Sequence, residues 1–514
     1  MVASRWSCLV LFGIMLPSPP SPSPSRWFRS LRRLKSNGQA SRTPASVCAE
    51  MLKKSREAFE SKKTAEESFR LGQLDGIVRM VVENEDDFVE ALNEDLHKPR
   101  FESLLSELIL VKNEAFFAIN NLKKWMQPEH VERNLATSLD QCFLVNEPMG
   151  VVLIVGDWSA PVQQCLIPLV GAIAAGNAVL LKPSENSSHT AELLQKLFPL
   201  YLDKEYYQVV YDVMLADLLE LRFDHIFYTG TFTKAQQVMQ AAAHHLTPVT
   251  LVVGGKNPCY VDQVCDLPVA AHRIAWARFH NAGQNNVAPD YILCHAEIRD
   301  KLVQALTSCV LEFYGAEPAQ SPSFGRMVNM EHFLRVRELM LSSGKVVIGG
   351  EVDESNKFIA PTVLLDVQES DAIMKHEILG PILPILTVYN ADEAVDFVRR
   401  KDKPLCLYVY SSSPKVISKF LTCTSSGSFC ANDSAIQSSL VTLPVAGVGA
   451  SGMGLYHGRY SFDTFSHRKS CVLRTTRVEC VTYLRFPPYE DQRLSLMMWA
   501  TSLSRKGAGW CNLL

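Results

Sequence analysis

The sequence predicts an α/β protein with parallel sheets that are covered by helices on both faces. Several stretches are unbroken apolar runs that are typical of buried strands, among them 150–156 (GVVLIVG), 178–182 (AVLLK) and 291–294 (YILC). Stretches with apolar residues at three- and four-residue spacing separate these runs, which is the pattern of a helix. Strands that are apolar throughout and alternate with helices favour a parallel sheet. In such sheets, ligands bind at the carboxyl ends of the strands.

The composition is ordinary for a soluble globular protein. The chain has 514 residues, enough for two or three domains, of which 47% are hydrophobic and 20% charged. The formal net charge is −3, so no basic field indicates a nucleic-acid partner. The 14 cysteines show neither C-x-x-C nor a metal-like Cys/His spacing. We interpret them as reduced cytosolic thiols and expect no metal site.

The first 45 residues differ in character from the rest. A short apolar run at 8–16 follows Arg5, and Pro/Ser-rich and basic stretches come after it. The run resembles the core of a signal peptide, but no small-x-small cleavage site follows. Pro/Ser-rich sequence cannot bury enough apolar surface to fold. Two interpretations stay open for 1–45, a disordered extension outside the first domain and a working signal peptide.

The last four residues fit the C-a-a-X motif for prenylation. They read Cys511-Asn512-Leu513-Leu514, and a final leucine favours a geranylgeranyl group on Cys511. The alternative is a chance match, because four residues make a weak pattern. Prenyl transfer is cytosolic, so a real motif argues against a signal peptide. One prenyl chain gives only marginal membrane residence without a second signal.

From residue 45 onward, the predicted elements follow one another closely. We expect helices at 45–63, 76–96, 101–126, 168–176, 233–245, 269–283, 297–315 and 392–401. We expect strands at 138–150, 150–156, 178–182, 225–230, 247–255, 291–294, 360–365, 381–389 and 404–412. A glycine-rich segment at 445–454 and an aromatic-rich segment at 457–467 close the second α/β unit. The tail from about Thr475 has no sustained period, so we expect it to be loosely ordered.

Six stretches together resemble the aldehyde dehydrogenases of class 3, and specifically their B branch. They keep the family's order and spacing, and the resemblance extends from about residue 46 to 514. That branch also ends in a prenylatable C-a-a-X, which strengthens the interpretation of Cys511. The stretches are GAIAAGNAVLLKPSE (171–185), FYTGT (227–231), HLTPVTLVVGGKNPCYVD (245–262), NAGQNNVAPDYILC (281–294), HEILGPILPI (376–385) and GVGASGMGLYHGRYSFDTFSH (447–467).

The resemblance implies a reaction, and one residue departs from it most sharply. The family oxidises aldehydes to carboxylic acids with NAD⁺ or NADP⁺, through a cysteine thiolate that attacks the carbonyl. The family's G-Q-T-C is Gly283-Gln284-Asn285-Asn286 here. An amide nitrogen is delocalised into its carbonyl and is no nucleophile, whereas a thiol can ionise near neutral pH. Losing a covalent nucleophile costs on the order of 10⁴–10⁶ in rate.

Two further catalytic positions are also substituted. The general base of the family's E-L-G-G-K is Val252 here, and valine can neither take a proton nor order water. A general base is worth about 10²–10⁴ in rate. The oxyanion amide of the family's W-N-Y-P is Ser159 here, which can donate but is shorter; such a donor is worth about 10²–10³. The thiols closest in sequence, Cys259 and Cys294, are expected to be packed core residues.

The cofactor positions implied by the resemblance are better kept. Lys182, Ser184 and Glu185 stand in the family's K-P-S-E, whose lysine and glutamate hold the adenosine ribose. Gly230 and Thr231 match the turn that passes the pyrophosphate, and Gly254 stands in the G-G pair of E-L-G-G-K. Glu377 matches the glutamate that holds the nicotinamide ribose. Ala235 replaces a glycine of the family and is expected to weaken NAD or NADP binding. Leu379 and Val445 stand where the family has phenylalanine, and Ala446 stands where it has glycine. Asn432-Asp433 matches the family's N-D.

The family fold implies three parts. A Rossmann-like NAD(P)-binding domain takes 46–255, and an α/β catalytic domain takes 256–443. A small β bridging element, through which homodimers pair, combines the strand near 137–150 with 444–480, and 481–514 is the C-terminal tail. With a prenyl group, the protein is expected on the cytoplasmic side of a membrane, such as the plasma membrane or a lipid droplet.

Three hypotheses follow for function. The first is an active, membrane-associated fatty aldehyde dehydrogenase that acts on medium- or long-chain aldehydes. The second is a pseudoenzyme that folds, pairs and binds a dinucleotide without chemistry. The third is a decaying gene product with no retained role. Asn286, Val252 and Ser159 lead us to predict that catalysis is lost or very low, which favours the second and third hypotheses over the first.

Overall fold

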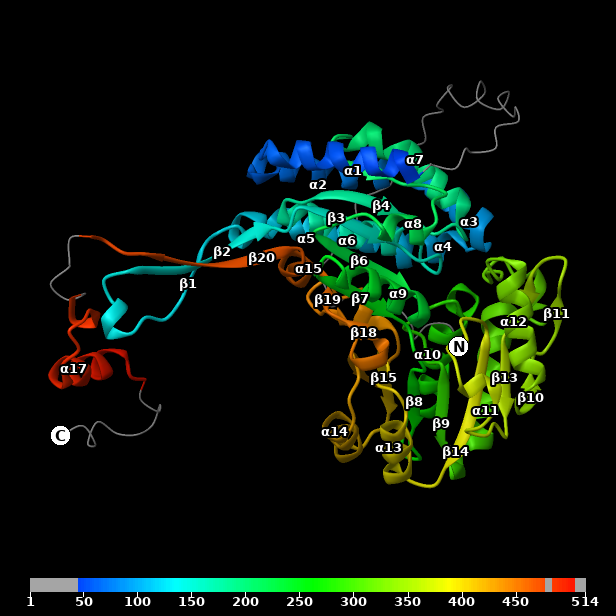
Figure 1. Cartoon of the computed structure of the whole chain (residues 1–514). Coiled ribbons are helices and arrows are strands. Elements are labelled where there is room, and N and C mark those ends of the chain that lie inside the picture. Colours follow the sequence, from blue (N-terminus) through cyan, green and yellow to red (C-terminus); the bar gives the residue numbers. More distant parts are fainter. Residues whose placement is uncertain (1–44, 477–482, 504–514) are drawn as a thin grey trace, which may run out of the picture. The chain divides into compact units, whose positions relative to one another are not determined.

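The first sheet carries the strands that position the predicted cofactor residues. In the computed structural model, which describes residues 45–476 and 483–503, its strand order is β18-β7-β6-β3-β4-β5 (Figure 1). All neighbouring pairs are parallel except β18 with β7. The bounds are β3 Val151–Val155, β4 Ala178–Lys182, β5 Tyr207–Val209, β6 His225–Gly230, β7 Val249–Val253 and β18 Gly452–Met453.

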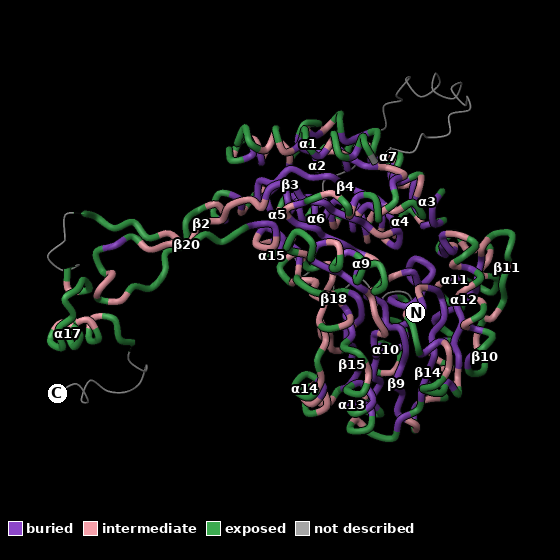
Figure 2. The backbone as a smooth tube through the Cα atoms, viewed as in Figure 1, coloured by how far each residue is buried: buried purple, intermediate pink, exposed green. Residues whose placement is uncertain are grey.

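Helices from the amino-terminal half, together with α15 near the carboxyl end, pack around this sheet. Helix α6 is apolar on all sides and buried throughout apart from Gln163, because α5 and α2 pack against it while it contacts β3 and β4 (Figure 2). The helices are α1 Ala45–Glu60, α2 Glu67–Glu83, α3 Glu85–Leu96, α4 Arg100–Ser103, α5 Ile109–Trp125, α6 Gln163–Ala175, α7 Ser188–Tyr201, α8 Leu215–Leu219, α9 Phe232–Ala243 and α15 Gly458–Thr464.

A second sheet, in the order β10-β13-β14-β9-β8-β15-β16, is parallel except for β10. Its strands are β8 Pro258–Val261, β9 Tyr291–His295, β10 Lys345–Ile348, β13 Thr362–Leu365, β14 Ile382–Val388, β15 Cys406–Tyr410 and β16 Ser428–Ala431. Its helices are α10 Leu267–Phe279, α11 Arg299–Tyr314, α12 Met330–Leu341, α13 Ala391–Arg400 and α14 Pro414–Cys423. The predicted α/β class with two parallel sheets is confirmed.

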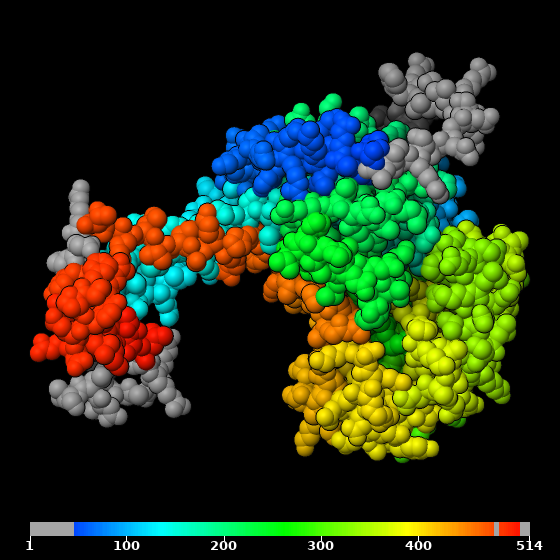
Figure 3. Space-filling model, in the orientation of Figure 1, coloured from blue at the N-terminus to red at the C-terminus, as the bar shows by residue number. Residues whose placement is uncertain are grey.

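Three small antiparallel sheets complete the described fold. The largest pairs β2 (Gln141–Pro148) with β20 (Ser466–Leu473) along their whole lengths, and β1 (Glu129–His130) joins β2. Figure 3 shows the cyan β2 region and the orange β20 region packed side by side. Strands β2 and β20 lie in the two segments predicted to form the bridging element, whereas β1 precedes the first of them; the domain boundaries themselves stay predictions. The other pairs are β11 (Val352–Asp353) with β12 (Phe358–Ile359), and β17 (Val445–Ala446) with β19 (Leu455–Tyr456).

The structure corrects the expectation of a loosely ordered tail. Residues Asp491–Thr501 form helix α17, which contacts the short turn at Leu135–Thr137. Its residues are good helix formers such as leucine, methionine, glutamine and alanine. None of its side chains is buried, so no one-sided apolar period marks it in the sequence. The predicted prenylation site Cys511 and the extension 1–44 lie outside the described residues.

Two further observations concern cysteines and membranes. The cysteines of the described chain are free thiols, and most of them are buried or partly buried. Among the described residues, no helix combines the length and the apolar character that crossing a bilayer requires.

Candidate active site

The loop that carries Asn286 begins with three residues in the left-handed region. After α10 ends, Asn281, Ala282 and Gly283 have φ values of 53°, 52° and 72°. Asparagine and glycine visit this region readily, but alanine is strained there. A side chain on Gly283 would also lie 2.2 Å from the Gly380 carbonyl oxygen. Such a backbone persists only where surrounding contacts hold it in place.

Buried amide side chains supply these contacts. Asn281 Nδ2 donates to the carbonyl oxygens of Ser159 (2.8 Å) and Gln284 (2.9 Å). Gln284 Nε2 in turn donates to the Arg326 carbonyl oxygen, and Gln284 Oε1 accepts from the Val328 N–H, each at 2.9 Å. The loop backbone is therefore fixed by groups from both halves of the described chain.

A side-chain amide also holds the backbone of Asn286 by hydrogen bonds, whereas the Asn286 side chain has no such partner. Asn257 Nδ2 donates to the carbonyl oxygens of Asn286 (2.8 Å) and Ala288 (3.0 Å). The Asn286 side chain is half-buried and makes no hydrogen bond to any other described residue. It lines a cavity of about 320 Å³. The loop thus presents a free carboxamide to this cavity.

The structure brings two of the three positions that the resemblance identifies as catalytic to this cavity. Ser159 lines it with Asn286, and the Ser159 hydroxyl oxygen accepts from Gln164 Nε2 at 3.1 Å. Val252 is not among the lining residues. It lies in β7 between Thr229 of β6 and Gly452 of β18, is 2% exposed, and packs in the core of the first half.

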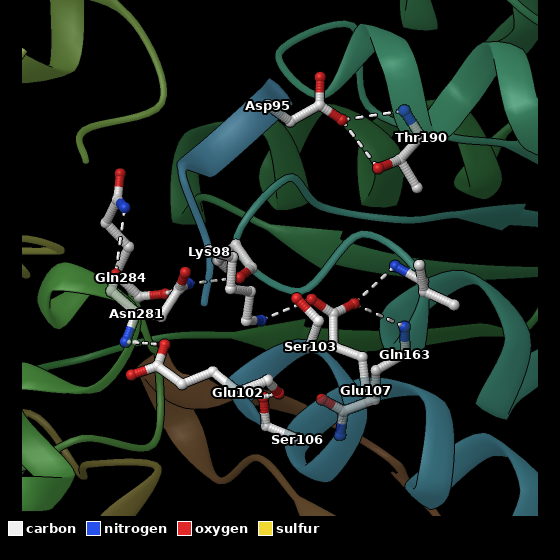
Figure 4. A network of polar contacts seen from close by, with 12 residues as sticks. Asp95, Lys98, Glu102, Ser103, Ser106, Glu107, Gln163, Thr190, Asn281 and Gln284 are labelled. Atoms are coloured by element: carbon white, nitrogen blue, oxygen red, sulfur yellow. Dashed lines mark hydrogen bonds and ion pairs between the residues drawn. The ribbon is translucent and has the colours of Figure 1, made fainter. Parts of the chain in front are cut away.

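Lys98, which lines the cavity, belongs to a buried ion pair (Figure 4). Lys98 Nζ lies 2.5 Å from Glu107 Oε1, and neither side chain exceeds 2% exposure. Glu107 Oε2 accepts from the backbone N–H groups of Val162 (2.8 Å) and Gln163 (3.2 Å), where α6 begins. A carboxylate at this end satisfies orphan N–H groups and complements the helix dipole. Glu107 belongs to a π-helical turn, Leu104–Leu108, which sequence patterns did not predict.

A second carboxylate joins the π-helical region to the Asn286 loop. Glu102 Oε2 accepts from the Asn281 N–H at 2.9 Å (Figure 4). Glu102 Oε1 lies 3.4 Å from His280 Nδ1. Burial raises the pKa of Glu102 to about 7, against the opposing effect of Lys98. Burial lowers the pKa of His280 to about 3, so its ring is neutral at physiological pH.

The predicted cofactor residues follow the carboxyl ends of β4, β6 and β7. Lys182 ends β4, where its buried side chain forms an ion pair with the half-exposed carboxylate of Glu185. Ser184 lies between them in the loop that leads to α7, and its side-chain oxygen accepts from the Asn186 N–H at 3.4 Å. These groups can donate to and accept from sugar hydroxyls.

Gly230 and Thr231 form the turn from β6 into α9. Gly230 has a φ of 150°, and a side chain there would lie 2.4 Å from the Tyr228 hydroxyl. Thr231 is exposed and immediately precedes α9, whose first N–H groups can bind an anion. Ala235 is 4% exposed in the first turn of this helix.

Gly254 and Glu377 meet although 123 positions separate them. A side chain on Gly254 would lie 2.1 Å from the Glu377 carboxyl oxygen, so only glycine leaves room for this carboxyl group. Burial raises the pKa of Glu377 to about 8, with Asp290 and Asp157 adding to the rise and Lys256 opposing it. Asp290 itself pairs with Lys256 (2.5 Å) and Arg278 (3.0 Å).

Three buried thiols lie in the family motifs or near the Asn286 loop. Cys259 and Cys294 are fully buried, as expected, and burial raises the pKa of both. Cys406, which sequence analysis missed, lies near the Asn286 loop because its N–H donates to Asn257 Oδ1 at 2.9 Å. Its sulfur accepts from Ser428 Oγ (3.2 Å) and Gln437 Nε2, but burial still raises its pKa. A thiolate is therefore disfavoured at all three positions.

Two parallel sheets and a cavity beside the loop at 281–287 define the architecture, and comparisons with known proteins agree. The model of the aldehyde dehydrogenase family matches residues 35–471, and the chain belongs to this family. Aldehyde dehydrogenase family 3 member B1 from Homo sapiens is 49% identical over 451 residues, which cover 87% of this chain and 96% of the relative. Member B3 from Mus musculus is 48% identical over 471 residues, which cover 90% and 96%.

Within the family, the chain falls in class 3 and its B branch. The solved structure of Staphylococcus aureus AldH in a substrate-bound state has a TM-score of 0.85 and 38% identity, covering 87% of this chain and 98% of that one. Members of the family are NAD(P)-dependent oxidoreductases of aldehydes. The aldehyde dehydrogenase fold predicted from the sequence is thereby confirmed.

Proposed function

We propose that this chain is a pseudoenzyme of the aldehyde dehydrogenase family, which keeps the fold and the cofactor site and has lost the chemistry. The observation that carries the proposal is Asn286 on an intact loop. The loop backbone is fixed by Asn281, Gln284 and Asn257, so the side chain at 286 faces the cavity from a stable position. That side chain is an amide, which cannot attack a carbonyl or carry an acyl group.

The other two catalytic positions support the same proposal. Val252 is packed in the core, so no proton acceptor reaches the cavity from β7. Ser159 keeps a hydroxyl, which already accepts from Gln164 Nε2. General-base and oxyanion groups are worth about 10²–10⁴ and 10²–10³ in rate. We therefore expect dehydrogenase activity to be lost or very low.

We infer that NAD or NADP still binds at the carboxyl edge of the first sheet. Lys182 and Glu185 offer a donor and an acceptor to the adenosine ribose, with Ser184 beside them. Gly230 and Thr231 form a turn at the start of α9, where the absence of a side chain on Gly230 lets the pyrophosphate approach the backbone. Gly254 leaves the room in which Glu377 can reach the nicotinamide ribose. When bound, the oxidised cofactor supplies a hydride acceptor.

Localisation and assembly belong to the proposal as well. We propose geranylgeranylation at Cys511, with residence on the cytoplasmic side of a membrane, such as the plasma membrane or a lipid droplet. We also propose a homodimer that pairs through the β2 and β20 region, where Val472 and Leu473 are more than half exposed. The resemblance implies medium- or long-chain aldehydes as substrates, and we propose that the cavity holds a molecule of this length.

An active membrane-associated fatty aldehyde dehydrogenase is the second candidate. It is favoured by 48–49% identity to relatives that carry enzyme names. It requires a nucleophile, and burial raises the pKa values of Cys259, Cys294 and Cys406. A decaying gene product is the third candidate, and it requires loss of folding or of cofactor binding.

The deciding experiment measures NAD(P)H production from a long-chain aldehyde by the purified chain. A triple variant with Asn286→Cys, Val252→Glu and Ser159→Asn restores the family's three groups. We expect no detectable NAD(P)H production by the natural chain. The variant should be faster by at least about 10⁴-fold, because a covalent nucleophile contributes about that much to the rate. Rapid turnover by the natural chain would refute the pseudoenzyme. If both proteins are silent and neither binds NAD(P)⁺, the decaying gene product is favoured.

A further inference from the structure

A second cavity adjoins the one that Asn286 lines. Its volume is about 210 Å³, and its walls come mainly from the starts of β15 and β16 and from the segment 443–446. Three residues, Val287, Ser438 and Val445, line both cavities. The two cavities are therefore neighbours, and these three residues form their common boundary.

The common boundary is made of small side chains and has no free polar group. Val287 and Val445 are apolar. The Ser438 hydroxyl donates to the Ala435 carbonyl oxygen at 2.7 Å. The Val287 carbonyl oxygen accepts from the Tyr408 hydroxyl, which joins this part of the loop to β15. An apolar group that lies against this boundary therefore deprives no hydrogen-bonding group of its partner.

The polar side chains of the second cavity also bond within its wall. Ser428 Oγ donates to Cys406 Sγ at 3.2 Å. Gln437 Nε2 donates to the Tyr408 hydroxyl oxygen at 2.9 Å. Gln437 Oε1 has no partner among the described residues, but it is buried and so lies out of reach of an occupant. The second cavity therefore demands no polar group from a molecule that enters it.

The rest of this wall is apolar. Leu405, Phe429 and Leu443 belong to it, and the described residues that line the cavity include no charged side chain. An apolar cavity of about 150 Å³ can stay dry and bind benzene, which has six carbons. A cavity of about 210 Å³ therefore has room for a hydrocarbon group of roughly three to six carbons. Such a wall favours hydrocarbon over water.

The boundary lies beside one end of the larger cavity. Val287 directly follows Asn286, which lines that cavity together with Ser159. Leu105 and Ile109 also line it and are 46% and 37% exposed, so the cavity opens to solvent between apolar side chains there. A chain that runs from Asn286 to this opening has the second cavity beside its first carbons.

We propose that the two cavities form one branched site, which holds a medium- or long-chain molecule with a short alkyl branch on the carbon next to its head group. The main chain lies in the cavity that Asn286 lines, and the branch enters the second cavity past Val445. A straight chain fills only one of the two cavities and binds less tightly. The proposal rests on the proposed function, because it treats the site as one that holds such a molecule without reaction.

The test compares two isomeric alcohols on the purified full chain by titration calorimetry. Decan-1-ol is linear, whereas 2-propylheptan-1-ol carries a propyl branch on the carbon next to its head group. The two share formula and head group, so a difference in affinity reports the branch. Each buried CH₂ group is worth about fourfold in affinity. With two or more additional groups buried, the branched alcohol should bind at least about tenfold more tightly.

Two substitutions fill the second cavity from different strands. Ala446→Leu adds bulk from β17 and Ser428→Leu adds it from β16, and neither residue lines the cavity of Asn286. In each folded variant the advantage of the branched alcohol should fall to about twofold or less, while decan-1-ol should bind as it does to the natural chain. Ala243→Leu, at the exposed end of α9, is the matched control and should change neither affinity. Thermal melting of each variant checks that it is folded.

Several outcomes would overturn the inference. Equal affinity for the two alcohols, or tighter binding of decan-1-ol, would show that the second cavity is not part of the site. An advantage that persists in the filled variants would place the branch elsewhere. Absence of binding by both alcohols would exclude such a site altogether. NAD(P)H production from decanal, measured in parallel, tests the proposed function alone: turnover would refute the pseudoenzyme and leave the ranking of the two alcohols as a separate result.

Discussion

The predicted cofactor edge and the cavity that Asn286 lines differ in which residues of the family motifs they contain. At the predicted cofactor edge, Lys182, Glu185 and Glu377 stand where the resemblance implies cofactor-binding residues. In the cavity, the supporting amides and carboxylates are in place, while Asn286 and Ser159 occupy the positions of the reactive groups. Support without reactive groups is what a binding site needs. The difference predicts that folding of the loop and chemistry at the loop depend on separate residues.

This comparison is tested most strongly by removing the buried support of the cavity. Lys98→Met leaves Glu107 buried with an uncompensated charge, although two N–H groups still donate to it. Breaking a buried ion pair in this way costs about 3–5 kcal/mol. We expect the thermal unfolding midpoint to fall by several degrees.

The control for this change is Arg100→Met. Arg100 pairs with Glu85 and Asp86 on the surface, where its side chain is 52% exposed. Such pairs contribute about 0–1 kcal/mol, so the midpoint should hardly move. Equal effects of Lys98→Met and Arg100→Met on the unfolding midpoint would show that stability does not depend on the buried pair of Lys98 and Glu107.

On the cofactor side, Lys182→Ala should weaken binding of NAD(P)⁺ markedly. The variant removes a buried ammonium group at the end of β4, and a hydrogen bond to a charged group contributes about 1.5–3 kcal/mol. Titration calorimetry should report a loss of about 10-fold to 150-fold in affinity. Asn286→Ala, which changes the cavity only, should leave cofactor affinity unchanged. If Lys182→Ala binds as well as the natural chain, the ribose is held elsewhere.

A smaller effect is expected from pH at Glu377. Burial and two neighbouring carboxylates, Asp290 and Asp157, raise its pKa to about 8. Below that pH the carboxyl group is protonated, and above it the carboxylate accepts hydroxyl donors more strongly. Affinity for NAD(P)⁺ should therefore rise by about 2-fold to 30-fold as the pH increases through 8.

The Glu377→Gln variant isolates this group. Glutamine cannot ionise, so the rise in affinity between pH 7 and 9 should vanish, while Asn286→Ala should retain it. A rise that persists in Glu377→Gln would assign the pH dependence to another group, and Asp157 would be the next to test, since burial raises its pKa as well.

Most of the fold could be predicted from the sequence, and the reasons are physical. Strands such as Ala178–Lys182 and His225–Gly230 are mostly apolar and buried because both faces of a parallel sheet are covered, and their bounds were predicted to the residue. Helix α17 was missed because it buries nothing. The π-helical turn at Leu104–Leu108 was missed because one extra residue per turn leaves the apolar spacing almost unchanged.

The site was predictable only in part. Family motifs predicted Asn286, Ser159 and the cofactor residues, because each of these residues lies within a short stretch of sequence that matches a motif. They did not give Gln164 or Lys98, because no short-range pattern links Lys98 to its partner Glu107 or to the start of α6. Likewise, Gly254 and Glu377 meet only in the folded chain. Roles that depend on burial and on distant partners need the three-dimensional structure.

The smallest expected effect comes from a single methyl group, that of Ala235 at the predicted cofactor edge. It lies in the first turn of α9, next to the turn of Gly230 and Thr231, and its N–H donates to the Thr231 carbonyl oxygen at 3.0 Å. If the pyrophosphate passes this helix start, Ala235→Gly should tighten NAD(P)⁺ binding by less than about tenfold, because it removes bulk without adding a hydrogen bond. The same change should cost up to about 1 kcal/mol of stability, since glycine is a poor helix former. Ala235→Val should do the reverse for binding. Should both variants bind the cofactor like the natural chain, the helix start does not face the pyrophosphate, and the cofactor edge has then diverged in function as the cavity is proposed to have done.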